Sequence, residues 1–111
     1  MYKILESNEA IEDVYNIALY MLENFSNQKA ADDFLTLYNR TANSLKMFPK
    51  GYDGKSIMYR GYEIHKTPFK SYCIMFVIND VLDEVVILRV FNERQNWKSI
   101  LKKKQLYHFN K

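Results

Sequence analysis

Two amphipathic helices are predicted in the N-terminal half of the chain. Residues 2–5 form a short strand candidate, and Ser7 or Asn8 can cap the helix that follows by accepting a hydrogen bond from its first turn. Apolar residues then recur at three- and four-residue steps, which is typical of helices with one buried face. The first stripe consists of Ile11, Val14, Ala18, Met21, Leu22 and Phe25, and the second of Ala30, Phe34, Leu37, Thr41 and Leu45. Only Ser26 and Asn27 interrupt the pattern, and they can cap the second helix. Because the connection is this short, we expect an antiparallel helical hairpin.

The C-terminal half is dominated by strand patterns. Residues 72–79 and 85–91 are runs of apolar, aromatic and β-branched side chains, each long enough for one strand. The short acidic segment 80–84 between them suits a hairpin connection. After these runs comes a polar segment, residues 92–96, and then apolar residues recur at helical spacing. The residues of this last pattern are Trp97, Ile100 and Leu101.

One further strand is predicted before this hairpin. Residues 56–65 read as a strand with an irregularity at Gly61, and residues 66–71 as the next turn. The tail from Lys102 onward is basic with apolar residues mixed in, and it could extend the helix, add a strand or stay mobile. Helices and strands are therefore grouped in the order β, α, α, β, β, β, α, which predicts an α+β fold with an antiparallel sheet.

Composition limits the class of protein. At 111 residues, of which 48% are hydrophobic, the chain predicts one domain covering residues 1–111. No apolar run approaches the ~20 residues that cross a bilayer, and the N-terminus turns acidic too early for a signal peptide. A single cysteine, Cys73, fits a reducing, cytoplasmic environment. There is no Gly-rich phosphate loop, no Cys and His set at zinc spacing and no nucleophile-elbow motif, so we expect neither a metal nor a cofactor.

Charge is distributed unevenly between the two halves. Residues 1–54 hold five Lys and Arg against eight Asp and Glu, a net charge of −3, whereas residues 55–111 hold eleven against five, a net charge of +6. A basic face can bind nucleic acid or an acidic protein segment. A basic solvated face beside an acidic one explains the same asymmetry without any ligand.

The order of these patterns resembles the RelE/ParE superfamily of bacterial toxins from type II toxin–antitoxin systems. The N-terminal strand and helical hairpin, which runs to residues 45–49, resemble the family's hairpin. Residues 71–80 are similar to the family strand in which a small residue and Tyr precede an aliphatic and aromatic run. Residues 85–101 resemble the last strand, polar turn and terminal helix of the ParE-like branch. The resemblance covers nearly the whole chain and implies a cytoplasmic toxin with plasmid-stabilising or growth-inhibiting action, neutralised by a cognate antitoxin.

The superfamily implies two targets. RelE-like members cleave mRNA on the ribosome, and ParE-like members poison DNA gyrase without being nucleases. Cleavage of RNA needs a base, an acid and cations that hold phosphate charge. If the chain is a ribosome-dependent endoribonuclease (an mRNA interferase), the resemblance points to Arg94, His65 and Glu63 as catalytic candidates. The candidates for binding the substrate or target are Lys66, Lys70, Arg89 and Trp97, the last as a stacking surface.

Three positions favour the ParE-like branch. Cys73 stands where RelE-like toxins often carry an arginine, Asn92 where many relatives carry a histidine, and Glu63 where a basic residue is usual. Each candidate also has a structural interpretation. His65 suits a solvated strand end, and Arg89, inside an apolar strand, suits a carboxylate partner or solvent. Trp97 suits a core anchor for the last helix.

We expect the functional site on the concave side of the sheet. It would lie between His65, the turn at residues 66–70 and the turn at residues 92–97, because neighbouring strands lie only ~4.8 Å apart. We also expect the antitoxin to cover apolar and basic surface by laying a helix in a groove or by adding a strand, since aromatic residues make up 15% of the chain. The alternative from a different class is a non-toxic binding module of the same fold that only engages a protein partner.

Overall fold

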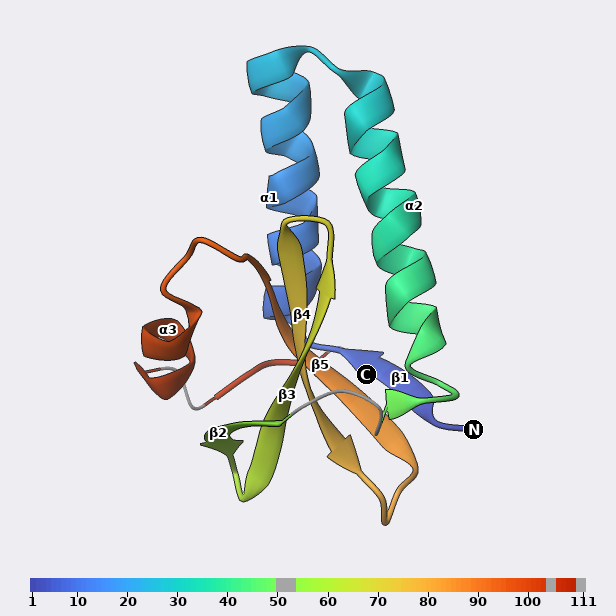
Figure 1. Cartoon of the computed structure of the whole chain (residues 1–111), viewed down its shortest axis with the longest axis vertical. Helices are drawn as coiled ribbons and strands as arrows, with labels where there is room; N and C mark the ends of the chain where they lie inside the picture. The colour runs from blue at the N-terminus through green and yellow to red at the C-terminus, as the bar shows by residue number, and fades with distance from the viewer. Residues whose placement is uncertain (50–53, 104–105, 110–111) are drawn as a thin grey trace.

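The computed structural model describes residues 1–49, 54–103 and 106–109 (Figure 1). The elements follow one another in the order β1 (Lys3–Glu6), α1 (Asn8–Phe25), α2 (Gln28–Ser44), β2 (Gly54–Tyr59), β3 (Tyr62–Phe69), β4 (Tyr72–Asn79), β5 (Glu84–Asn92) and α3 (Trp97–Lys103).

The five strands form one mixed sheet in the order β1-β5-β4-β3-β2. β1 pairs with β5 in parallel, and the remaining neighbours are antiparallel. The register between β4 and β5 shifts between Met75 and Phe76. The N-terminal strand therefore lies at one edge of the sheet, beside the last strand of the chain.

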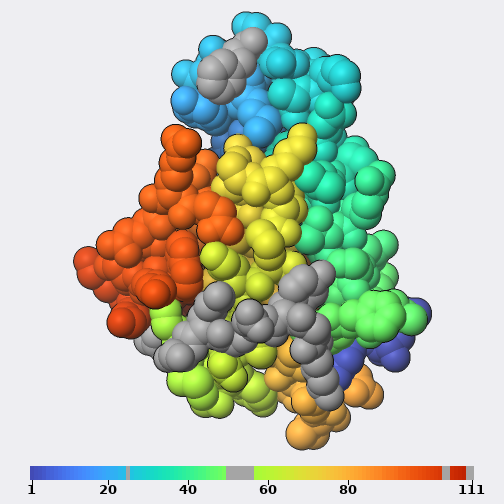
Figure 2. Space-filling view, viewed as in Figure 1, coloured from blue at the N-terminus to red at the C-terminus, as the bar shows by residue number. Residues whose placement is uncertain are grey.

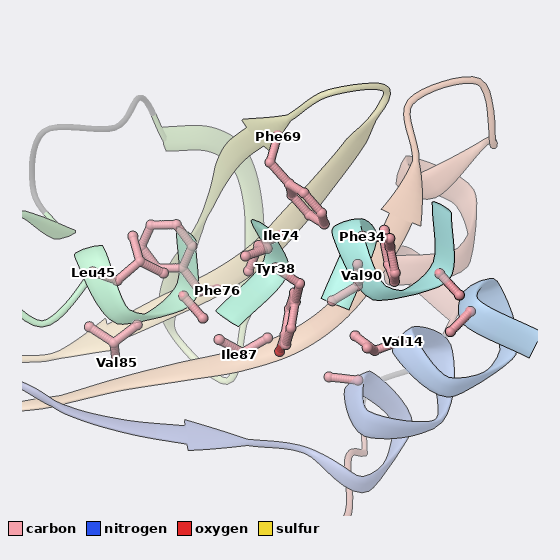
Figure 3. Close-up of a cluster of buried hydrophobic side chains, with 14 residues drawn as sticks. Val14, Phe34, Tyr38, Leu45, Phe69, Ile74, Phe76, Val85, Ile87 and Val90 are labelled. Atoms are coloured by element: carbon pink, nitrogen blue, oxygen red, sulfur yellow. The ribbon is translucent and has the colours of Figure 1, made fainter. Parts of the chain in front are cut away.

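The helical hairpin covers one face of this sheet. α1 packs against β5 and α2 against β3, and the two helices stand side by side in Figure 1. Figure 3 shows Phe34 and Tyr38 of α2 among Ile74, Ile87 and the other labelled residues of this core. The local reasons for the helices are as expected from the sequence: Ser7 caps α1 by accepting from the Ala10 N–H at 2.9 Å, and Asn27 caps α2 by accepting from the Ala30 N–H at 2.9 Å.

The opposite face of the sheet carries a second apolar cluster. Met75, Leu88 and Phe91 point to this side and are covered by Leu101 of α3 and by Tyr107 of the tail. The tail, residues 106–109, is neither helix nor strand. Its His108 accepts a hydrogen bond through its C=O from the Asn8 N–H at 2.6 Å, which ties it to the start of α1. Expectations for residues 104–105 and 110–111 lie outside the described residues.

The predicted α+β class is confirmed, with the N-terminal strand, the helical hairpin, the antiparallel meander and the short C-terminal helix. One local expectation was wrong: residues 56–65 are not one strand but the β2–β3 hairpin, which turns at Arg60 and Gly61. Both residues have positive φ, 49° and 86°. Paired positive φ values match the right-handed twist of adjoining strands in a two-residue hairpin.

The turn expected at residues 66–71 is also shorter than predicted. β3 continues to Phe69, and only Lys70 and Ser71 connect it to β4. Pro68 is tolerated in the strand because the pairing recorded between β2 and β3 extends no further along β3 than His65. Among the described residues no strand pairs with β3 at Pro68 on that side, so its missing N–H costs no ladder hydrogen bond there.

Candidate functional site

The turn between β5 and α3 is built from local hydrogen bonds. The Asn92 side chain accepts from the Arg94 N–H at 2.9 Å, and the Gln95 side chain accepts from the Asn92 N–H at 2.9 Å. Asn96 begins α3 by accepting from the Ser99 N–H at 3.4 Å. These Asn and Gln side chains replace ladder and helix partners, as is typical of turns and caps. The turn therefore holds a defined shape, with the Arg94 side chain exposed.

This turn lies next to the β3–β4 turn. The Glu93 N–H donates to the Ser71 C=O at 2.8 Å, which joins the two segments. Figure 2 shows the residues from the turn through α3 (dark orange to red) as a bulge beside the β3–β4 region (yellow). The sequence-based expectation that these two turns meet at one end of the sheet agrees with this geometry.

Lys66, Glu93 and Trp97 form a small cluster on the α3 side of the sheet. Lys66 Nζ donates to Glu93 Oε2 at 3.0 Å and lies 5.4 Å from the centroid of the Trp97 ring. Lys98 Nζ lies 5.6 Å from the same ring. An ammonium within about 6 Å of an indole face is attracted by the ring quadrupole. Trp97 is thus contacted by two cations while it remains only partly buried.

His65 and Glu63 lie on the opposite face from Lys66. Side chains alternate along a strand, and the His65 ring stacks on Phe76, which belongs to the core beneath the helical hairpin. The ring centroids are 5.5 Å apart. His65 Nδ1 is buried and has no hydrogen-bond partner among the described residues. The structure therefore does not bring the two proton-transfer candidates together with Lys66 and Trp97.

The two remaining cationic candidates face other partners. Arg89 makes a two-pronged ion pair with Asp13 of α1, with Nε to Oδ2 at 2.7 Å and Nη2 to Oδ1 at 2.8 Å. The hydrogen bonds that Arg89 donates to Asp13 raise the pKa of the guanidinium, so its charge is permanent. Lys70 lies in the β3–β4 turn, where its charge helps to lower the pKa of Asp33 on α2, after the larger effect of the Lys29 hydrogen bond.

Cys73 has a thiol of low reactivity. The side chain is fully buried, and burial raises the pKa of its thiol to about 11. The reactive form of cysteine is the thiolate, which is scarce at neutral pH under these conditions. Cys73 thus packs as a small apolar residue in the second apolar cluster.

Sequence comparison places this architecture in a known family. Residues 4–97 match the model for the ParE toxin of the type II toxin–antitoxin system parDE. The chain belongs to the ParE toxin family. A search of curated protein sequences finds no match.

Two solved structures share the fold of this ParE-family chain. A chain from the chromosomal ParDE toxin–antitoxin system of P. aeruginosa superposes with a TM-score of 0.65 at 14% identity, covering 83% of this chain and 96% of its own. A chain of the RelBE2 toxin–antitoxin complex from Mycobacterium tuberculosis gives a TM-score of 0.56 at 18% identity, covering 82% and 96%. At these identities the likeness concerns the fold.

Sequence reasoning missed the partners of its own candidates in this ParE-family chain. Glu93 pairs with Lys66 across 27 positions, and Asp13 pairs with Arg89 across 76. Neither spacing leaves a local signal, because the contacts depend on tertiary pairing. Lys98 could have been found, since it directly follows Trp97 at the start of a helix. Among the described residues no helix has the length and apolar character needed to span a membrane, and no group of three or more metal-ligating side chains is found there.

Proposed function

We propose that this chain is the toxin of a type II toxin–antitoxin pair and that a cognate antitoxin neutralises it. The toxin arrests bacterial growth by binding a target of the DNA gyrase kind, without cutting RNA. The family match supports the toxin role, and the two structural neighbours come from toxin–antitoxin systems. The observation that carries the choice of target is the position of His65 and Lys66 on opposite faces of β3.

RNA cleavage needs a base, an acid and phosphate-binding cations around one scissile bond. Here His65 stacks on Phe76 beneath the helical hairpin, whereas Lys66 lies with Trp97 on the α3 side. Glu93 already offsets the charge of Lys66, and Asp13 that of Arg89. The arrangement supports binding better than acid–base catalysis, because neither His65 nor Glu63 stands beside these cations.

The binding surface we assign is the β5–α3 turn with Trp97. Arg94 is exposed, and no side-chain partner for it is found among the described residues. Lys98 is exposed beside the partly buried Trp97 ring. Aromatic and arginine side chains on a rigid support are typical anchors of protein interfaces. A preformed turn also reduces the ordering cost of binding.

Removing the Arg94 side chain tests this assignment. Arg94→Ala should relieve growth arrest on regulated expression in a bacterial host without the antitoxin, and should change the free energy of unfolding by less than ~0.5 kcal/mol. Folding is preserved because the turn uses the main-chain N–H of Arg94. Arg40→Ala, an equally exposed arginine on α2, is the matched control and should stay toxic. A folded Arg94→Ala chain with full toxicity would refute the site.

Replacing His65 separates the two mechanisms. His65→Gln should retain toxicity and inhibition of purified gyrase, with no cleaved mRNA from either wild type or variant. Cleaved mRNA with the wild type that disappears with His65→Gln would establish the mRNA interferase instead. Unaffected growth on wild-type expression, together with antitoxin binding, would favour the non-toxic binding module.

A further inference from the structure

Two exposed segments meet beside the N-terminal residues of the chain. One segment, residues 46–48, follows α2, and the other, residues 80–83, is the turn between β4 and β5. The Tyr2 N–H donates to the Lys46 C=O at 3.0 Å, and the Tyr2 hydroxyl donates to Asp80 Oδ1 at 2.6 Å. In Figure 2 the end of the helical hairpin (green), the N-terminus (blue) and the β4–β5 turn (orange) meet at the lower right. Tyr2 therefore stands between the two segments and is bonded to both.

Each segment carries two large apolar side chains that face solvent. In the β4–β5 turn, Val81 is 90% exposed and Leu82 62%. In the segment after α2, Phe48 is 72% exposed and Met47 58%. After Met1, Val81 and Phe48 are the most exposed large apolar residues of the described part of the chain. Grouped exposure of this kind marks an interaction surface.

The β4–β5 turn has a defined shape. The Asn79 side chain accepts hydrogen bonds from the Val81 N–H at 3.1 Å and from the Leu82 N–H at 3.2 Å. These bonds fix the backbone of the turn while the two aliphatic side chains stay in solvent. Because a preformed turn needs little ordering when it binds, this apolar pair is suited to an interface.

The two segments carry opposite charges. Lys46 belongs to the first, and Asp80 and Asp83 belong to the second. Within residues 1–49, 54–103 and 106–109, neither Lys46 nor Asp83 has a side-chain hydrogen bond or ion pair. A complementary partner must therefore bring a basic, apolar segment to the turn and an acidic, apolar segment to residues 46–48. A second copy of this chain carries both.

We propose that the free chain forms a two-fold symmetric dimer through this end of the molecule. Residues 46–48 of one copy pack on residues 80–83 of the other, and a two-fold axis near Tyr2 makes this contact twice, because in such an interface the same surface meets itself. In each contact the two apolar pairs cover each other. Lys46 of one copy pairs with Asp83 of the second copy.

This dimer leaves the proposed target-binding surface free. The β4–β5 turn and the β5–α3 turn lie at opposite ends of β5, whose nine residues span about 30 Å at ~3.3 Å per residue. The Arg94 and Trp97 surfaces of the two copies therefore lie at the far ends of the assembly. The inference goes beyond the toxin function and does not depend on which target the chain binds.

Charge reversal tests the interface with the purified chain. In sedimentation equilibrium the wild type should form, as its concentration rises, a species of twice the 13.3 kDa mass of one chain. Lys46→Glu and Asp83→Lys should each raise the dissociation constant about tenfold or more, because each places like charges opposite one another in both contacts. A lysine is compatible with the backbone of Asp83, since Lys70 has the same φ of 52° in this chain.

A mixture of these two variants distinguishes the symmetric contact from damage to the fold. In a mixed dimer the substituted residue of each copy lies opposite the substituted residue of the other, and Lys46 again lies opposite Asp83. Both contacts are then attractive, so the mixture should dimerise about tenfold or more tightly than either variant alone. If both variants are folded and the mixture dimerises no better than they do separately, the symmetric contact is wrong.

An apolar variant tests the same surface without relying on Lys46 or Asp83. Leu82→Asp should weaken the dimer about tenfold or more, because it places a charge in the apolar contact. Tyr15→Asp, at a position on α1 that is 61% exposed, is the matched control and should dimerise as the wild type does. Equal dissociation constants of the two variants would refute the site. A wild-type chain that stays monomeric at every concentration, and gains amide protection at residues 80–83 only with the antitoxin, would assign the surface to the antitoxin and overturn the proposal.

Discussion

Arg89 and Asp13 link α1 to the far strand of the meander. The Asp13 carboxylate accepts two hydrogen bonds from the Arg89 guanidinium and one from the Val90 N–H at 2.9 Å. Both charged side chains are mostly buried, with 19% and 16% exposed. Because β1 is paired with β5 only as far as Ile87, Asp13 also serves as the partner for the part of the edge that β1 leaves open.

Asp13→Ala should therefore be strongly destabilising. The change leaves the Arg89 charge and the Val90 N–H without their acceptor, and breaking a buried pair on one side costs about 3 kcal/mol or more. The double variant Asp13→Leu, Arg89→Met should lose less, because it leaves no uncompensated charge. Urea unfolding of the wild type, the single variant and the double variant measures their free energies of unfolding. An Asp13→Ala chain as stable as the wild type would contradict this account.

Arg89 illustrates what the sequence predicts about a single residue and what only the structure shows. Its position inside an apolar strand indicated either a carboxylate partner or a role in function. The structure supplies the carboxylate, but Asp13 lies 76 residues away, on the side of α1 that faces the sheet, and gives no local signal. Target binding by Arg89 stays a prediction. A loss of target binding in an Arg89 variant would have to be distinguished from unfolding of the chain.

At the scale of elements, the spacing of apolar residues along the chain predicted both long helices and the two central strands. The caps at Ser7 and Asn27 were readable as well, because capping depends on one side chain and its next few neighbours. The β2–β3 hairpin was missed. Its turn residues are Arg60 and Gly61, and an arginine at positive φ is not among the Asn, Asp and Gly signals that mark such turns.

This hairpin predicts a position-specific effect of adding one methyl group. Gly61→Ala should lower the free energy of unfolding by about 1 kcal/mol, because φ is 86° there and side chains rarely adopt such a backbone. A Cβ at Gly61 would meet nothing within 4 Å, so the cost is conformational only. Arg60→Asn, which suits positive φ better, should be neutral or slightly stabilising. Equal stabilities of the two variants by thermal unfolding would argue against the turn.

At the scale of the whole molecule, the C-terminal tail packs against β2 and the start of α1. Tyr107 is 4% exposed and packs edge to face on Tyr59 of β2 with ring centroids 5.4 Å apart. His108 reaches α1, where its N–H donates to Glu9 Oε1 at 3.0 Å and its Nδ1 lies 2.7 Å from Glu9 Oε2. The tail thus crosses the face of the sheet opposite the hairpin and reaches the start of α1.

Tyr107→Ala tests how far the tail stabilises the fold. Losing a buried aromatic side chain costs about 3 kcal/mol or more, so the melting temperature of the free chain should fall by more than ~10 °C. Saturating antitoxin should then restore stability by about 4 kcal/mol at a thousand times its Kd, since it binds only the folded chain. His108→Ala, whose side chain is largely exposed, is the control and should shift the melting temperature far less. If Tyr107→Ala melts as the wild type does, the tail does not stabilise the fold.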